Sequence, residues 1–320
     1  MNLFYRIFLI LIIALGGVFC DAARITERMV DGRPGFDFYR LLQLNGARGS
    51  ARGKRYFFQS RFYSCNVERD SRKAVVNGVK VDLNFPVRFF GARPYISKFD
   101  WVKSFRPLLF PGTLRSHRIA TVTIDMGHGG SDPGALGQFS REKDLTLKVG
   151  KRLGQFLTAN GYRVRYTRYS DVKIPLERIG SIQRTHRSDL FISIHVNSAR
   201  DRSVSGIETY CLTPAYAPSS GSRKLQRVPQ RGNMFDENNL VLAYFVQSQM
   251  VKRTGAADRG VKRANFVVLR DINAPGILVE IGFISNRNEE RQLNNRIYID
   301  ALARGIAEGV IRYRNSMKQK

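Results

Sequence analysis

The sequence is poor in cysteine and histidine, and each shortage excludes a class of site. Only three cysteines occur, Cys20, Cys65 and Cys211, and no two of them form a CxxC pair. This excludes a disulfide framework and a zinc site built from cysteine. Cys65 and Cys211 either pair in an oxidising compartment or remain buried thiols. Histidine occurs four times in 320 residues, so any site that uses imidazole has very few candidates.

Acidic residues are also scarce relative to basic ones. The chain has 53 Lys and Arg against 26 Asp and Glu, a formal net charge of +27. Such a charge favours binding to a polyanion, whether nucleic acid, anionic lipid or an anionic wall polymer. The basic residues are spread through otherwise apolar segments, and no nucleic-acid-binding module is recognisable. Together with the amino-terminal segment, this argues against a nucleic-acid partner.

Long hydrophobic runs are absent beyond the amino terminus. Residues 7–19 (IFLILIIALGGVF) are uncharged, follow a basic residue and precede small ones. This order is typical of a secretory signal peptide, and the run is shorter than the roughly 20 residues that span a bilayer. We predict a signal peptide over residues 1–22 and an exported protein of the periplasm or cell envelope, with no transmembrane span in the mature chain. The alternatives are an uncleaved anchor or a buried helix. Lipidation of Cys20 is disfavoured, because Val18 and Phe19 stand where a lipobox requires small residues.

Residues 23–54 have the composition of a linker. Residues 45–54 (NGARGSARGK) are rich in Gly, Arg and Ser, which favours irregular structure. Only residues 36–44 carry a pattern that suits a short helix. We therefore predict a linker or poorly ordered segment over residues 23–54.

A small β-rich domain is predicted over residues 55–115. Residues 56–67 are aromatic and roughly alternating, as in a strand, and Asn77-Gly78 separates two apolar runs. That dipeptide favours a β-hairpin, because both turn residues can take positive φ. The segment has no histidine and its acidic residues are mostly spread apart, so we expect no catalytic role. It either docks to the wall or to a protein partner, or is a structural appendage.

Strand-like and helical patterns alternate over residues 116–316. Apolar runs with the length of buried strands occur at 119–125, 162–167, 190–194, 207–212, 266–269 and 277–280. Apolar residues at helical spacing occur at 145–156, 176–182, 240–251 and 297–311. Such alternation is typical of an α/β domain. We predict a mostly parallel central sheet flanked by helices, preceded by the small β-rich domain.

Four polar side chains stand where the strands of such a sheet end or its first helix begins. They are His128, Glu142, His195 and Glu280, and Glu142 follows the glycine-rich loop 127–138. Ligands of open α/β sheets bind beyond the carboxyl ends of the strands. Two imidazoles and one carboxylate form a catalytic zinc set with a fourth position for water, on which Glu280 would act as general base. Each residue alone also has a structural explanation, such as a helix-start carboxylate or an ion-pair partner, so the pattern leaves both origins open.

Several segments resemble one known family. They are IDMGHGGSDPGALG at 124–137 with Glu142-Lys143 after it, SIHVNS at 193–198, ADRGVKRANFVVLR at 257–270 and LVEIGFISN at 278–286. In order and spacing they resemble the zinc-dependent N-acetylmuramoyl-L-alanine amidases of the amidase-3 type. The resemblance covers residues 118–314, and it identifies residues 116–316 as a zinc amidase catalytic domain.

The resemblance implies an activity and a role for each site residue. It implies one Zn2+ per chain, held by His128, Glu142 and His195, with Glu280 as the catalytic carboxylate. The implied reaction is hydrolysis of the amide between the lactyl group of N-acetylmuramic acid and L-alanine in peptidoglycan. Peptidoglycan carries free carboxylates, so a chain of charge +27 would be held near it in a salt-dependent way.

Two other functions remain open from the residues alone. A zinc peptidase acting on another wall amide would use the same four side chains. A non-catalytic wall-binding protein would be favoured if any of the four were replaced, and none is. Some family members carry a long inserted helix that blocks the zinc, but the corresponding residues 214–239 are short and rich in Pro, Ser, Gly and Arg. We therefore expect a mobile loop there and an open site that needs no activator.

Overall fold

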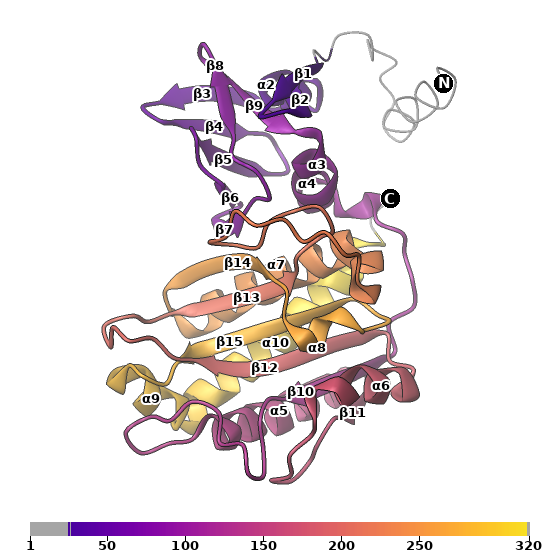
Figure 1. Ribbon diagram of the computed structural model, residues 1–320, viewed down its shortest axis with the longest axis vertical. Coiled ribbons are helices and arrows are strands. Elements are labelled where there is room, and N and C mark those ends of the chain that lie inside the picture. Colours follow the sequence, from indigo (N-terminus) through magenta and orange to yellow (C-terminus); the bar gives the residue numbers. More distant parts are fainter. Residues whose placement is uncertain (1–24, 26, 319–320) are drawn as a thin grey trace.

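The computed structural model describes Ile25 and residues 27–318. The predicted signal peptide and Cys20 lie outside the described residues. A small unit (residues 27–115) stands above a large unit (residues 116–318), and one continuous sheet runs through both (Figure 1). No helix in this part of the chain is long and apolar enough to cross a membrane.

The large unit is built on a mixed sheet. In spatial order its strands are β11 (Arg163–Tyr166), β10 (Thr121–Met126), β12 (Leu190–Asn197), β15 (Gly276–Phe283), β13 (Ile207–Leu212) and β14 (Asp258–Ala264). The first four run parallel, β13 is antiparallel to β15, and β14 is parallel to β13. Every residue of β10 is buried, as expected for a parallel strand covered on both faces. The predicted α/β class is confirmed.

Helices cover both faces of this sheet (Figure 1). On one face lie α5 (Glu142–Ala159), α7 (Asp236–Thr254) and α10 (Arg296–Ser316); on the other lie α6 (Leu176–His186) and α8 (Val267–Arg270), while α9 (Arg287–Leu293) follows β15. Helices α7 and α10 pack closely because α10 has glycine at the contact. A Cβ at Gly309 would lie 2.5 Å from the Cα of Val246. The helical patterns read from the sequence correspond to α5, α6, α7 and α10.

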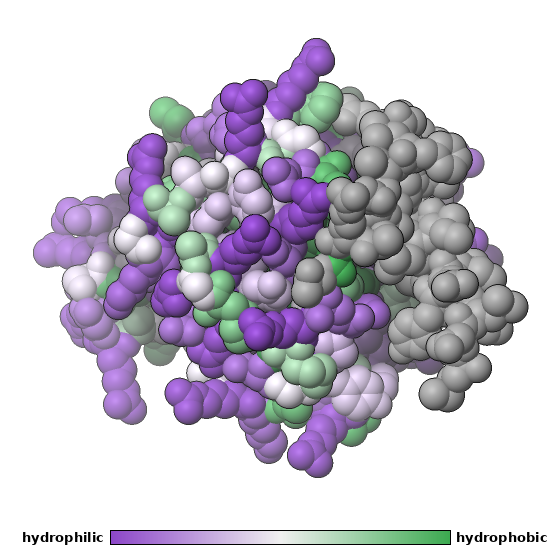
Figure 2. All heavy atoms as spheres, turned by 90° about the horizontal axis from the view of Figure 1, so that it is seen from above, coloured by the Kyte–Doolittle hydropathy of each residue, from purple (hydrophilic) through white to green (hydrophobic). Residues whose placement is uncertain are grey.

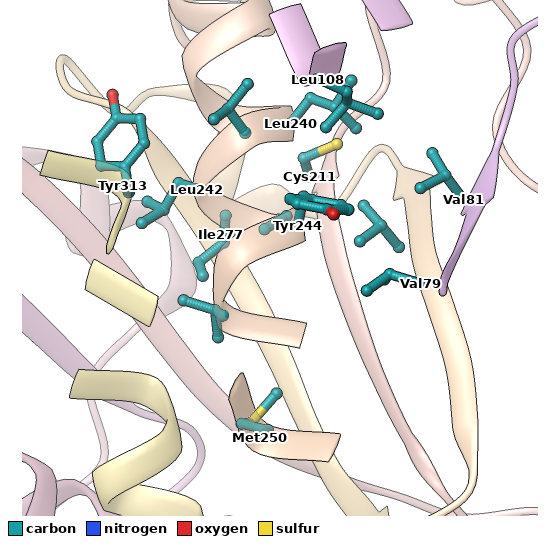
Figure 3. Close-up of a cluster of buried hydrophobic side chains, with 14 of the residues drawn as sticks. Val79, Val81, Leu108, Cys211, Leu240, Leu242, Tyr244, Met250, Ile277 and Tyr313 are labelled. Atoms are coloured by element: carbon teal, nitrogen blue, oxygen red, sulfur yellow. The ribbon is translucent and has the colours of Figure 1, made fainter. Parts of the chain in front are cut away.

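Helix α7 also joins the cores of the two units. Leu240 and Tyr244 of α7 lie with Cys211 of β13 and Val81 of β7 (Val79–Asp82) in one cluster of buried side chains (Figure 3). The Tyr244 hydroxyl donates a hydrogen bond to the backbone carbonyl of Val76 at 3.3 Å. Cys211 and Cys65 are both buried free thiols. The small unit therefore shares a hydrophobic core with the large one.

The small unit extends the large sheet beyond β14. Its strands β7, β6 (Lys73–Val76), β5 (Ser64–Glu68), β4 (Arg55–Gln59) and β3 (Arg48–Arg52) follow β14 in that order. A second sheet contains β1 (Glu27–Val30), β2 (Arg33–Asp37), β9 (Arg93–Ser97) and β8 (Arg88–Phe90). The helices α2 (Phe38–Leu44), α3 (Lys98–Asp100) and α4 (Arg106–Leu109) complete the unit. Seen from this end of the molecule, hydrophilic side chains project over most of the visible surface that is not grey (Figure 2).

Residues 27–52 differ from the expected linker, because they form β1, β2, α2 and β3. The Gly- and Arg-rich segment pairs with β4 through its backbone from Arg48 to Arg52. Backbone pairing needs no apolar side chains, so composition alone misses such an edge strand. Residues 56–67, expected as one strand, are the hairpin β4–β5, whose turn is held by the Ser60 hydroxyl accepting from the Tyr63 N–H at 3.0 Å. The hairpin at Asn77-Gly78 is confirmed, with φ of 45° and 84°.

One predicted strand is wrong. Residues 266–269 belong mostly to helix α8. The strand of this region is β14, which begins eight residues before the predicted strand. Its sequence, DRGVKRA, contains two pairs of adjacent charged residues and lacks an apolar run. Val268 and Leu269 instead bury their side chains in a second core cluster beside Phe191 and Leu278. The apolar residues that suggested a strand therefore belong to a helix that packs on the sheet.

Candidate metal centre

Three of the four predicted site residues meet at one point. His128 follows β10, Glu142 is the first residue of α5, and His195 lies in β12. One ligand atom from each lies within 4.8 Å of the others. The Nε2 of His128 is 3.2 Å from Oε2 of Glu142, and Nδ1 of His195 is 2.9 Å from Oε1 of the same carboxylate. This metal group, as we refer to it, is compact enough to hold one cation.

Glycines make room for the metal group. A Cβ at Gly127 would lie 2.3 Å from Cε1 of His195, and a Cβ at Gly134 would lie 2.6 Å from Oε2 of Glu142. His128 itself has a φ of 64°, a left-handed conformation that non-glycine residues adopt at a cost. The glycine-rich loop therefore serves to bring two imidazoles and a carboxylate together, and not only to turn the chain.

Hydrogen bonds within the metal group shift the pKa values of its three side chains. Hydrogen bonding to Glu142 raises the pKa of His128 to about 9, against the opposing effect of burial. Burial lowers the pKa of His195, but the hydrogen bond to Glu142 and the charges of nearby carboxylates together outweigh it, so the net shift is upward. Burial likewise raises the pKa of Glu142, but its hydrogen bonds to both histidines hold it well below its usual range. A carboxylate between two imidazoles that would otherwise carry protons is an arrangement that a divalent cation can occupy by displacing those protons.

Neighbouring groups fix the orientation of these side chains. The Nδ1 of His128 is 3.0 Å from Oδ2 of Asp132, which leaves Nε2 directed at the metal group, as in histidine ligands oriented by a second carboxylate. Backbone N–H groups of Ala135 and Val196 donate to the two oxygens of Glu142 at 2.8 and 2.9 Å. Sequence reasoning missed Asp132, although its spacing of four residues from His128 inside the tight loop was a usable signal.

Glu280 lies beside the metal group, one strand away. It pairs in register with His195 across β12 and β15. Its Oε2 is buried and has no hydrogen-bond partner among the described residues. Burial raises the pKa of Glu280 to about 7, with Glu142 and Glu208 adding to the rise and the two histidines opposing it. Such a carboxyl group exchanges a proton near neutral pH, which is the property a general acid and base requires.

The other two histidines lie outside the metal group. Nδ1 of His186 is 3.1 Å from the Thr123 hydroxyl, and His117 lies beside the ring of Tyr313. Residues 214–239 differ from the expected mobile loop, because residues 236–239 belong to α7 and Arg72 of the small unit donates to the backbone carbonyls of Pro218, Ser219 and Ser222 at 2.9–3.1 Å. Their only helical residues before α7 are the short turn Arg231–Phe235.

Fold and site together define an α/β protein with a candidate metal centre of two histidines and a glutamate. Residues 122–312 match the family described as N-acetylmuramoyl-L-alanine amidase, and the chain belongs to that family. The match begins within β10, so the small unit lies outside it.

Curated relatives and solved structures agree with this assignment. The amidase AmiA of Escherichia coli (strain K12) is 30% identical over 248 residues, 70% of this chain and 86% of that protein. AmiC of Neisseria meningitidis serogroup B is 33% identical over 230 residues, 64% of this chain; the chain spans only 55% of its length. The crystal structure of an N-acetylmuramoyl-L-alanine amidase from Clostridium difficile 630 superposes with a TM-score of 0.52 at 32% identity, covering 62% of this chain and 98% of the other.

Proposed function

We propose that this chain is an exported zinc amidase that hydrolyses the amide between the lactyl group of N-acetylmuramic acid and L-alanine in peptidoglycan. The observation that carries the proposal is the metal group of His128, Glu142 and His195, with Glu280 in register beside it. The family match and the names of the relatives support the bond. The signal peptide pattern of the sequence supports export, and the charge of +27 supports an anionic polymer as substrate.

The residues of the metal group fit a zinc ion. Two nitrogen donors and one oxygen donor, with no fourth protein ligand, match the donor set of catalytic zinc. The room left by Gly127 and Gly134 is filled by the donor side chains themselves. When bound, zinc would polarise the scissile carbonyl and lower the pKa of the attacking water.

Glu280 then supplies the proton transfers. Its Oε2, buried and without a partner in the described part of the chain, accepts a proton from the water as the water attacks the carbonyl carbon. The same oxygen returns that proton to the nitrogen of the leaving L-alanine, which would otherwise depart as an unstable amide anion. A carboxyl group with a pKa near the working pH performs both transfers. His128 and Glu142 are held by Asp132 and by backbone N–H groups, so they need not reorganise during the reaction.

Digestion of purified peptidoglycan, followed by mass spectrometry of the fragments, tests the proposal. The expected products are glycan strands with free lactyl carboxylates and intact stem peptides that begin with L-alanine. Chelation should abolish their formation, and added zinc should restore it. Fragments cut within the stem peptide would instead identify a zinc peptidase. Binding to the wall without any cleavage would identify a non-catalytic wall-binding protein.

We propose that the small unit contacts the wall or a protein partner. It lies outside the family match, and it carries no histidine. It is joined to the large unit by a shared core, so any partner bound there would be held at a fixed orientation to the metal group. Loss of wall binding on substitution of its exposed cations, with turnover of soluble fragments retained, would support this role.

A further inference from the structure

A buried acid stands on the far side of Glu280 from the metal group. Glu208 of β13 pairs in register with Glu280 of β15, which in turn pairs with His195 of β12. The three side chains therefore occupy one row across three neighbouring strands. Like charges directly opposite each other in a sheet are destabilising. Glu208, whose side chain is 3% exposed, must therefore be neutralised by other groups.

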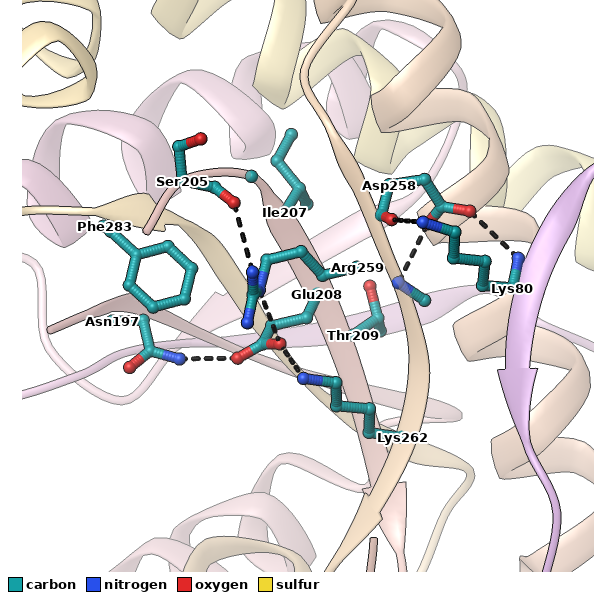
Figure 4. A network of polar contacts seen from close by, with 12 residues as sticks. Lys80, Asn197, Ser205, Ile207, Glu208, Thr209, Asp258, Arg259, Lys262 and Phe283 are labelled. Atoms are coloured by element: carbon teal, nitrogen blue, oxygen red, sulfur yellow. Dashed lines mark hydrogen bonds and ion pairs between the residues drawn. The ribbon is translucent and has the colours of Figure 1, made fainter. Parts of the chain in front are cut away.

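Two cations and two neutral donors surround Glu208; Figure 4 shows Asn197, Arg259 and Lys262 around its carboxylate. Nδ2 of Asn197 donates to Oε1 at 2.6 Å, and the Tyr210 hydroxyl donates to the same oxygen at 3.0 Å. On the other oxygen, Oε2, Nε of Arg259 donates at 3.3 Å and Nζ of Lys262 forms a close ion pair. Glu208 is thus fully satisfied, in contrast to the unpartnered oxygen of Glu280.

A β-bulge places both cations on the same face. Between Ile207 and Thr209 of β13 the partner residues on β14 advance from Asp258 to Val261, so β14 has one extra residue there. A bulge of this kind redirects side chains and occurs often beside active sites. Gly260 has a φ of +88°, and a Cβ there would lie 2.8 Å from the Lys80 carbonyl oxygen. The bulge therefore depends on glycine, where β7 of the small unit meets β14.

Arg259 and Lys262 carry two positive charges, and Glu208 balances only one of them. Arg259 and Lys262 share one partner acid, since Asp258 is directed elsewhere and accepts from Gln247 and the backbone of Lys80. The Arg259 side chain is 35% exposed and that of Lys262 is 18% exposed. In the described part of the chain nothing accepts a hydrogen bond from Nη2 of Arg259, and Lys262 uses one of its three N–H groups. These spare donors and one net positive charge suit a carboxylate ligand.

We propose that Arg259 and Lys262, aligned by Glu208, form a specificity subsite that binds a free carboxylate of the stem peptide during cleavage. This inference rests on the proposed function. Neighbouring strands lie about 4.8 Å apart, so Glu208 stands about 10 Å along the row from His195. An extended peptide advances about 3.3 Å per residue. The second and third residues of the stem peptide therefore lie about 3.3 and 6.6 Å beyond the first, and a side chain ending in a carboxylate spans the remaining distance to the two cations. Glu208 is a positioning residue, because it acts only through the two cations.

The experiment compares paired soluble substrates with the full chain and zinc. One pair of muramoyl tripeptides differs only in a free carboxylate or a carboxamide on the second residue, and another pair differs in the same way on the third. At one of these positions the wild type should prefer the free carboxylate by about ten-fold in kcat/KM, through KM, the loss expected for one charge-assisted hydrogen bond. Arg259→Gln and Lys262→Gln should remove this preference, so that the variants cleave both members of the pair with the same kcat/KM.

Matched variants separate a subsite from a structural effect. Arg259→Lys and Lys262→Arg keep the charge and should keep the preference. Arg163→Gln and Lys252→Gln alter exposed cations on β11 and α7 and should change nothing. Equal losses on both members of a pair would overturn the subsite, as would a wild type that cleaves both members equally well. A wild type that cleaves neither member refutes the proposed function itself, so the two failures are distinguishable.

Discussion

Glu280 and His195 face each other in register across β15 and β12, and they differ in how their polar atoms are satisfied. Nδ1 of His195 is 2.9 Å from Glu142, whereas Oε2 of Glu280 has no partner within the described residues. A buried polar atom without a partner costs free energy. The sheet therefore holds a carboxyl oxygen without a partner directly beside a histidine whose Nδ1 is already paired with Glu142.

Replacing Glu280 should separate catalysis from metal binding. In Glu280→Gln the isosteric amide keeps the shape of the side chain but cannot accept the proton of the attacking water. We expect turnover to fall by at least about 100-fold while zinc content stays at one per chain, measured by elemental analysis. Thermal stability should not fall, because the substitution removes a buried charge. Wild-type turnover in this variant would exclude Glu280 from the mechanism.

Removing either histidine of the metal group should remove the metal. His128→Ala and His195→Ala each delete one of three donors, so we expect zinc content after dialysis to fall well below one per chain, together with the rate. His186→Ala is the matched control, because His186 contacts Thr123 outside the metal group, and it should keep its zinc. A His128→Ala protein that still carries one zinc per chain would contradict the ligand set.

Replacement of Gly127 by alanine should disturb the metal group. The added methyl group would lie 2.3 Å from Cε1 of His195, so the imidazole ring must shift. We expect Gly127→Ala to lower zinc affinity and to destabilise the fold by about 1–3 kcal/mol, a typical cost of overpacking. Gly276→Ala is the control, since its Cβ would meet only atoms 3.5 Å away or further. Equal zinc affinity in the Gly127 variant and the control would disprove the steric role of this glycine.

The pH dependence of stability should report the raised pKa of Glu280. In the chelated protein this pKa is about 7, against 4.5 for an ordinary Glu. Between these values the folded state binds more protons than the unfolded state, so the free energy of unfolding falls as pH rises. A shift of this size corresponds to at most about 3 kcal/mol. The difference between wild type and Glu280→Gln, measured by urea unfolding from pH 4.5 to 7.5, should show this fall; a difference independent of pH would refute it.

Releasing the loop from the small unit should not activate the enzyme. Arg72→Ala removes the hydrogen bonds to Pro218, Ser219 and Ser222. We expect chymotrypsin to cut faster at Tyr216, which is exposed, while turnover of soluble muropeptides stays unchanged. Arg223→Ala, an exposed cation of the same loop, should leave the cutting rate at the wild-type value. A strong rise in turnover on cutting would mean that the loop restrains the site.

Sequence patterns predicted the parts of the fold that depend on local periodicity. The strands β10, β12, β13 and β15 and the helices α5, α6, α7 and α10 are apolar at the spacing of their type, and the hairpin at Asn77-Gly78 follows from two residues that tolerate positive φ. Strands β3 and β14 were missed, because each is held by backbone pairing and polar contacts. Asp132 and Glu208 were also missed as members of the site.

The sequence by itself determined which side chains were available, since few histidines and one glycine-rich loop leave little choice for a metal site. Apolar periodicity also determined the α/β class, because burying each apolar face requires the matching backbone period. Only the tertiary structure decided the sheet order, the bulge at Gly260 and the row of His195, Glu280 and Glu208. Register between strands distant in the chain is set by hydrogen bonds and packing that no local pattern encodes.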